Sequence, residues 1–170
     1  MQVISLAKLG LMAGGVLILG SCGESLGPKG GFHSKYSVAR NALESGDYAR
    51  ASRSYQRLIA EAGPLAPRLQ LEYAHAELRS GNYTEAARIA GSLADGQSGE
   101  ARGAALAVQG TAQHELGLAL LAKGEVEPGK AQLIQARAAL DEVLKSPADL
   151  DPLGSMAGRR ASIAARLQKL

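Results

Sequence analysis

The chain has 170 residues with nineteen Lys and Arg against sixteen Asp and Glu, a formal net charge of +3. This length is typical of one domain, and so small a basic excess argues against a nucleic-acid-binding protein. Aromatic residues make up only 4% of the chain and Trp is absent, which disfavours a β-sandwich or barrel. The apolar content is mostly Ala and Leu, two strong helix formers, so the composition predicts an all-α fold. The single Cys excludes an intrachain disulfide and a cysteine-rich zinc site.

Residues 1–21 have the composition of a signal peptide. Lys8 carries the only charged side chain before an apolar run over residues 9–20. This run is too short for a membrane-spanning helix, which needs about 20 apolar residues, and it has the length of a signal-peptide core. Four glycines within it weaken the case for a stable spanning helix further.

The segment Leu19-Gly20-Ser21-Cys22 follows the apolar run and contains the only Cys. It resembles the lipobox of bacterial lipoproteins, in which the Cys is acylated and becomes the new N-terminus. The resemblance implies lipidation at Cys22, and two or more acyl chains give stable anchoring. Residue 23 is Gly, whereas Asp at this position marks inner-membrane retention in enterobacteria, so the resemblance implies the periplasmic face of the outer membrane. Inner-membrane anchoring stays open, as do an ordinary secretory signal with a chance Cys and an uncleaved anchor.

Residues 22–31 are rich in Gly and show no hydrophobic periodicity. This composition is typical of a flexible linker. The sequence therefore predicts a tether over residues 22–31 and a helical domain over residues 32–170.

Three similar turn segments recur along the helical domain. Residues 45–48 (Ser-Gly-Asp-Tyr) are repeated as Ser-Gly-Asn-Tyr at residues 80–83, and Lys-Gly-Glu-Val follows at residues 123–126. In the first two, Gly is suited to end a helix in the left-handed conformation, while Asp47 or Asn82 caps the next helix. A period near 34 residues is typical of stacked helix–turn–helix units. We expect helices near residues 34–45, 48–61, 65–80, 84–94, 100–123, 127–145 and 153–169.

The residues around these turns resemble tetratricopeptide (TPR) repeats. In that family a Gly-Asp/Asn-Tyr turn is followed, three positions after the Tyr, by a small residue, here Ala51 and Ala86. The pair Leu116-Gly117 matches the first helix of a third unit, whose second helix is longer and has Gly129 at the small position. The resemblance covers about residues 32–147 and implies a right-handed α-solenoid of about three hairpins with a C-terminal capping helix. A generic bundle of helical hairpins is the alternative.

Catalytic signatures are absent from the sequence. The three histidines stand outside metal-binding motifs, and there is no Gly-rich phosphate loop. Four acidic residues in the first two units are expected to be solvated. The sequence therefore predicts a protein that is not an enzyme and that holds no metal or cofactor. The residues concerned are His33, His75 and His114, and the acids Glu44, Asp47, Glu61 and Glu72.

The TPR resemblance also places certain positions of each first helix on a concave groove. Such a groove would be basic in its middle and apolar toward the third unit, and it would suit an extended or helical peptide. The Asn residues of the carboxylate clamp found in chaperone-binding members are not matched. The predicted groove residues are Tyr36, Arg40, Glu44, Arg68, Leu71, His75, Arg79, His114 and Leu118, with His33 and Leu121 at its ends.

These features predict a non-catalytic, lipid-anchored adaptor of the bacterial envelope with a protein or peptide partner and no nucleic acid. In plan it resembles the accessory lipoproteins of Tad/Flp pilus and secretin systems. It is less similar to the longer lipoprotein of the outer-membrane β-barrel assembly machine. The alternatives are a small-ligand carrier with an apolar pocket near Leu118 and Leu121, and a structural lipoprotein that tethers the outer membrane to peptidoglycan.

Overall fold

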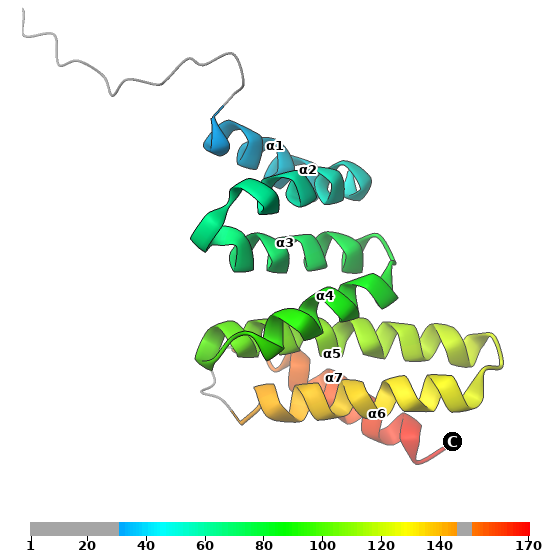
Figure 1. Ribbon diagram of the computed structural model, residues 1–170. Coiled ribbons are helices and arrows are strands. Elements are labelled where there is room, and N and C mark those ends of the chain that lie inside the picture. Colours follow the sequence, from blue (N-terminus) through cyan, green and yellow to red (C-terminus); the bar gives the residue numbers. More distant parts are fainter. Residues whose placement is uncertain (1–30, 146–150) are drawn as a thin grey trace, which may run out of the picture.

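The computed structural model describes residues 31–145 and 151–170 of the chain. This part is all-helical, which confirms the prediction of an all-α fold, and each of the seven expected helices is present (Figure 1). A short 3₁₀ turn, Gly63–Leu65, joins the second and third helices. The predicted signal peptide and Cys22 lie outside the described residues. The helices are α1 Phe32–Glu44, α2 Tyr48–Glu61, α3 Ala66–Arg79, α4 Tyr83–Asp95, α5 Gly99–Ala122, α6 Val126–Val143 and α7 Ser155–Leu167.

Each helix packs against the next one along the chain. Figure 1 shows α1 and α2 at one end of this stack and α6 and α7 at the other. Helix α7 contacts both α5 and α6, the two longest helices. None of the described helices is long and apolar enough to cross a bilayer.

Three glycines end helices in the same left-handed conformation. Gly46, Gly81 and Gly124 have φ angles of 82°, 83° and 81°, values that residues with a Cβ rarely adopt. In two of these turns, the N–H of the residue after the glycine donates a hydrogen bond to the carbonyl five residues earlier. Asn82 donates to the Glu77 carbonyl, and Glu125 donates to the Leu120 carbonyl. This pattern satisfies carbonyls at the helix end.

The first two turns differ in how the following helix is capped. Asp47 caps α2 as predicted, because its carboxylate accepts a hydrogen bond from the Arg50 N–H at 3.1 Å. Asn82 does not cap α4 through its side chain. Its amide instead donates to the buried carboxylate of Glu77 at 2.7 Å, so it supports the end of the preceding helix.

Small side chains dominate the core. Thirteen of the buried apolar residues are alanines, and the larger fully buried side chains are few: Tyr55, Leu58, Leu133, Leu140, Val143 and Ile163. Alanine lets helix backbones approach one another closely, because its side chain adds only one methyl group to the interface.

Helices α5 and α6 approach each other closely. A Cβ on Gly117 would lie 2.9 Å from Leu133 Cδ2 and 3.0 Å from the Gly129 carbonyl oxygen. A Cβ on Gly129 would lie 3.0 Å from the Gly117 carbonyl oxygen. The two glycines that match small TPR positions therefore face each other across the helix pair, and Gly129 lies in the first turn of α6.

Candidate functional site

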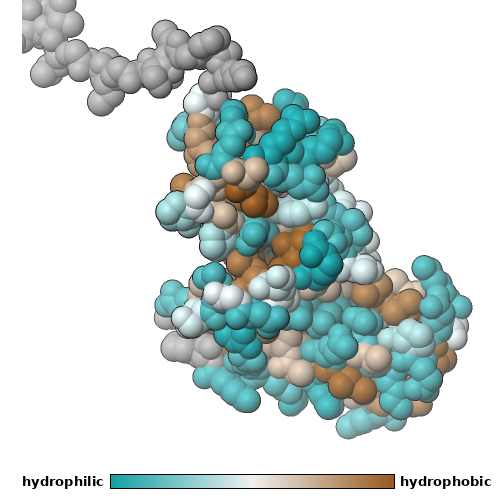
Figure 2. Space-filling view, viewed as in Figure 1, coloured by the Kyte–Doolittle hydropathy of each residue, from teal (hydrophilic) through white to brown (hydrophobic). Residues whose placement is uncertain are grey.

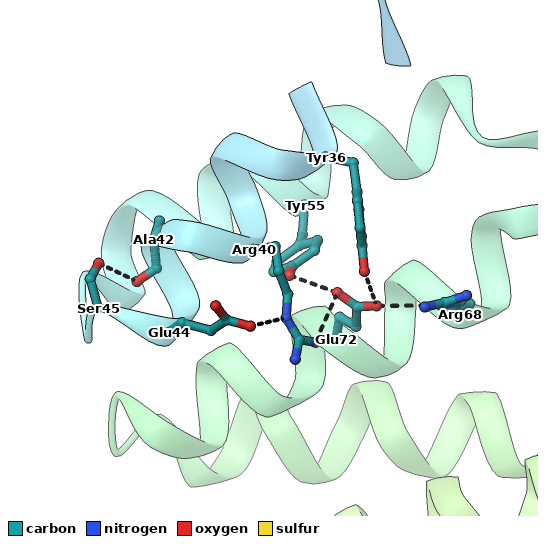
Figure 3. A network of polar contacts seen from close by, with 8 residues as sticks. All are labelled: Tyr36, Arg40, Ala42, Glu44, Ser45, Tyr55, Arg68 and Glu72. Carbon is teal, nitrogen blue, oxygen red and sulfur yellow. Dashed lines mark hydrogen bonds and ion pairs between the residues drawn. The ribbon is translucent and has the colours of Figure 1, made fainter. Parts of the chain in front are cut away.

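A buried carboxylate joins the first three helices. Glu72 of α3 is only 8% exposed. Its Oε1 accepts a hydrogen bond from the Tyr36 hydroxyl of α1 at 2.9 Å, and its Oε2 accepts one from the Tyr55 hydroxyl of α2 at 2.7 Å (Figure 3). The expectation that Glu72 is solvated is therefore wrong. Burial and the neighbouring carboxylate raise the pKa of both tyrosine hydroxyls, which stay protonated donors.

Two arginines surround this carboxylate. Arg40 Nη1 lies 3.8 Å from Glu72 Oε2, and Arg68 Nε lies 3.5 Å from Glu72 Oε1. Arg40 Nε also donates to Glu44 Oε1 at 2.6 Å. A buried carboxylate needs such partners because its desolvation is unfavourable. The structure thus brings four predicted groove residues into one network around Glu72, which the prediction missed: Tyr36, Arg40, Glu44 and Arg68.

A signal for the burial of Glu72 is present in the sequence. Leu69, Glu72 and Ala76 are spaced i, i+3 and i+7, so they share one face of α3, and all three are buried. An acid between two apolar residues of a core-facing stripe is a candidate for a buried, paired group.

A hollow of about 320 Å³ lies between α1 and α3, beside this network. We call it the α1–α3 hollow. One of its side chains is Arg79, whose guanidinium lies 5.6 Å from the centre of the Tyr48 ring and contacts no acid among the described residues. Four predicted groove residues line the hollow together, and the lining residues are Arg40, Leu43, Glu44, Glu72, His75 and Arg79.

His75 is the titratable ring of this hollow. The residue is exposed, yet the protein atoms crowded around the ring reduce its hydration. This desolvation lowers the pKa of His75, and the charges of Arg40 and Arg79 add to the effect against the opposing charge of Glu72. The ring is therefore neutral in the α1–α3 hollow at neutral pH, and there it offers one hydrogen-bond donor and one acceptor.

The remaining second- and third-unit residues do not line this hollow. Leu71 is half-buried and packs against two core clusters, one around Leu93 and one around Ile89. Leu118 is half-buried on α5. Leu121 packs against the cluster that joins α6 to α7, which includes Leu133 and Ile163.

His114 lies beneath α7 and is not on an open groove. The residue is 7% exposed, and its Nδ1 is 2.6 Å from Nη1 of Arg159 on α7. The same Arg159 nitrogen donates to Glu115 Oε1 at 2.5 Å. Because a guanidinium has no acceptor, Nδ1 must accept the hydrogen bond, which assigns the neutral ring with its proton on Nε2. Sequence reasoning missed this because it did not place α7 against α5.

No group of three or more His, Cys, Asp or Glu residues within the described ranges is arranged to hold a metal ion. His33 is exposed at the start of α1. The polar features that the structure brings together are thus the Glu72 network, the adjoining α1–α3 hollow, and the His114–Arg159 contact.

Comparisons with known proteins give the chain no family. No protein-family model, no curated protein and no solved structure matches it.

Proposed function

We propose that the chain is a non-catalytic, lipid-anchored adaptor of the bacterial envelope whose α1–α3 hollow binds a segment of a protein partner. In this proposal the helices form a TPR-like solenoid, and the acylated Cys22 holds it at the periplasmic face of the outer membrane. Assembly of a pilus or secretion system is the process we favour, on the resemblance in plan.

The observation that carries the proposal is the composition of the hollow. Arg40, Glu44, His75 and Arg79 come from two helices and line one concavity with both charge signs and an exposed imidazole. Such mixed, hydrogen-bonding surfaces suit a peptide segment, which presents amides and charged side chains in alternation. Arg79 supports this assignment because its charge has no acidic partner among the described residues.

The turns support a repeat architecture. Gly46, Gly81 and Gly124 adopt nearly the same φ, and each joins the two helices of one hairpin: α1 to α2, α3 to α4 and α5 to α6. Equal turns within the hairpins give the units a similar shape, as in repeat proteins, and stacking of such units gives an extended surface for a partner.

Site-specific photocrosslinking in living cells tests the proposal. A photoreactive amino acid at position 75 should yield a defined adduct that mass spectrometry assigns to one envelope protein. The same amino acid at Arg88, exposed on α4 and lining a different hollow, serves as the control position. Arg79→Glu should remove the adduct at position 75 by reversing the charge of the hollow.

Binding at the α1–α3 hollow and anchoring through Cys22 are tested separately. Equal adducts at positions 75 and 88, or an adduct that survives Arg79→Glu, would show that the α1–α3 hollow is not the binding surface. Anchoring is tested independently by Cys22→Ser. A Cys22→Ser chain that stays in the membrane fraction at unchanged size would contradict lipidation.

A further inference from the structure

Helix α2 carries three exposed arginines on one face. Arg50, Arg53 and Arg57 are spaced i, i+3 and i+7, which places them within about 60° of one another around the helix. None of the three forms an ion pair with an acid among the described residues. We call this surface the α2 arginine face.

The acids near the α2 arginine face are engaged elsewhere. Glu44 pairs with Arg40, and Glu61 pairs with Lys35. Asp47 caps α2. The positive charge of the three arginines is therefore not neutralised within the first hairpin.

The charge is unevenly distributed along the stack. Residues 31–62 contain five Lys and Arg against three Asp and Glu, whereas residues 63–145 contain eight against ten. Helix α7 is also basic, but two of its arginines pair with the core helices, Arg159 with Glu115 and Arg160 with Asp141. The first hairpin thus presents the largest set of unpaired arginines on a single helix face.

The first hairpin forms the end of the stack that no other described helix covers, and Arg57 of the α2 arginine face lines a hollow there. This hollow of about 340 Å³ opens between α1 and α2, and the residues around it all belong to these two helices. Figure 2 shows hydrophilic side chains over this end. Val38, which is 41% exposed, contributes an apolar side chain to the lining of the hollow.

The same end is the one closest in the chain to the proposed anchor. Helix α1 begins at Phe32, ten residues after Cys22. Ten residues span at most about 35 Å when fully extended, so an acylated Cys22 keeps the first hairpin near the bilayer. The inference below rests on this proposed anchor.

We propose that the α2 arginine face binds the phosphate groups of anionic lipids and seats the first hairpin on the membrane. Guanidinium groups bind phosphate through two parallel hydrogen bonds, and this binding is stronger than a point-charge contact. Each arginine near an anionic surface contributes about fivefold in binding, so three contribute on the order of a hundredfold. Acylation and the arginines then act as two membrane signals on one chain, and the arginines fix the orientation of the stack.

Quenching of a fluorophore by lipid headgroups tests this docking. The full chain is reconstituted into vesicles that contain a headgroup-linked nitroxide quencher, either in phosphatidylcholine alone or with about one third phosphatidylglycerol. An encoded fluorophore replaces Ala49, exposed on α2, or Ala138, exposed on α6. We expect quenching at position 49 on anionic vesicles only, reversal at about 1 M salt because charges are then screened beyond about 3 Å, and no quenching at position 138.

Two triple variants with equal loss of charge locate the effect. Arg50→Gln/Arg53→Gln/Arg57→Gln should abolish the quenching at position 49. Lys123→Gln/Lys145→Gln/Lys169→Gln removes three exposed charges outside the first hairpin and should preserve it. Circular dichroism checks that both variants stay helical.

Separate outcomes of these experiments would contradict the proposed anchor and the proposed docking surface. A full chain that does not float with neutral vesicles would contradict the anchor, while quenching on anionic vesicles still reports on the arginines. Equal quenching on neutral and anionic vesicles, or equal loss in both triple variants, would overturn the docking surface. An unquenched position 49 on anionic vesicles would also overturn it and would assign the arginines to an acidic protein surface.

Discussion

At the residue scale, the hydrogen bonds to Glu72 are the most consequential polar contacts of the first hairpins. Tyr55 is fully buried and donates to a carboxylate that is itself buried. A hydrogen bond to a charged group contributes about 1.5–3 kcal/mol, and the loss of one donor leaves the carboxylate less well solvated by the protein.

Tyr55→Phe should therefore lower the free energy of unfolding by about 1.5–3 kcal/mol, as measured by urea denaturation. Tyr83→Phe is the matched control, because the half-buried Tyr83 makes no side-chain hydrogen bond among the described residues. A loss of the same size in both variants would mean that Glu72 does not depend on the Tyr55 hydroxyl.

The second prediction at this scale concerns the facing glycines of α5 and α6. Gly117→Ala places a methyl group against the Gly129 carbonyl and Leu133, where the backbone cannot yield without separating the helices. Overpacking costs about 1–3 kcal/mol, and alanine recovers about 0.5–1 kcal/mol of helix propensity. We expect a net loss of roughly 1–2 kcal/mol and a lower Tm in thermal unfolding.

Gly158→Ala supplies the control for this substitution. Gly158 lies in α7, and a Cβ there meets no atom within 4 Å. The substitution should stabilise the protein by about 0.4–1 kcal/mol. If Gly117→Ala also raises Tm, the close approach of α5 and α6 does not limit stability.

At the element scale, α7 is the described α-helix with the fewest buried residues. Ile163 is its only buried residue, the half-buried Met156 and Leu167 pack beside it, and two arginines supply polar contacts. Arg159 contacts His114, and Arg160 donates to Asp141 of α6 at 2.7 Å. Protonation of His114 would replace a hydrogen bond to Arg159 with contact between two cations.

The docking of α7 should therefore weaken in mild acid. Burial lowers the pKa of His114, with the charges of Arg159 and Arg166 adding to it against Glu115. A base whose pKa is lowered in the docked state stabilises docking above the ordinary histidine value of about 6.5. That contribution is lost as pH falls below this value, with at most a tenfold change in the docking equilibrium per pH unit.

The methyl NMR signal of Ile163 reports this equilibrium directly. It should shift toward its unpacked position below about pH 6.5 in the wild type. In His114→Asn the side-chain carbonyl accepts from Arg159 without titrating, so the shift should disappear. His75→Asn leaves His114 in place and should retain it. A pH response that persists in His114→Asn would assign the transition to another group.

At the scale of the whole molecule, the sequence predicts the features that neighbouring residues determine, such as helix boundaries and turns. Helix breakers and caps act within a few residues, so all seven helices and the left-handed glycines Gly46 and Gly81 follow from the pattern alone. Gly117 and Gly129 match small positions of the TPR resemblance, but only the structure shows that they face each other. The prediction that the Asn82 side chain caps α4 is wrong, because its amide hydrogen-bonds the buried Glu77 carboxylate instead.

The burial of polar side chains could not be predicted from the sequence, because it depends on which helices pack against one another. The burial of Glu72 requires Tyr36 and Tyr55 to arrive from two other helices, 36 and 17 residues away along the chain. The burial of His114 requires α7 to return across α5, which brings Arg159 to it from 45 residues away. A helix face that looks polar in isolation becomes a core face once a neighbour supplies the complementary charge.

The unequal helix lengths have a practical consequence. Helix α5 has 24 residues and is about 36 Å long, whereas α3 and α4 have 14 and 13 residues and are each about 20 Å long. The turn at Gly124 therefore projects beyond the stack, and residues 122–128 are all exposed. This projecting loop is a natural insertion point for a reporter domain or an epitope tag, which would label the chain while leaving both of its proposed contact surfaces unobstructed.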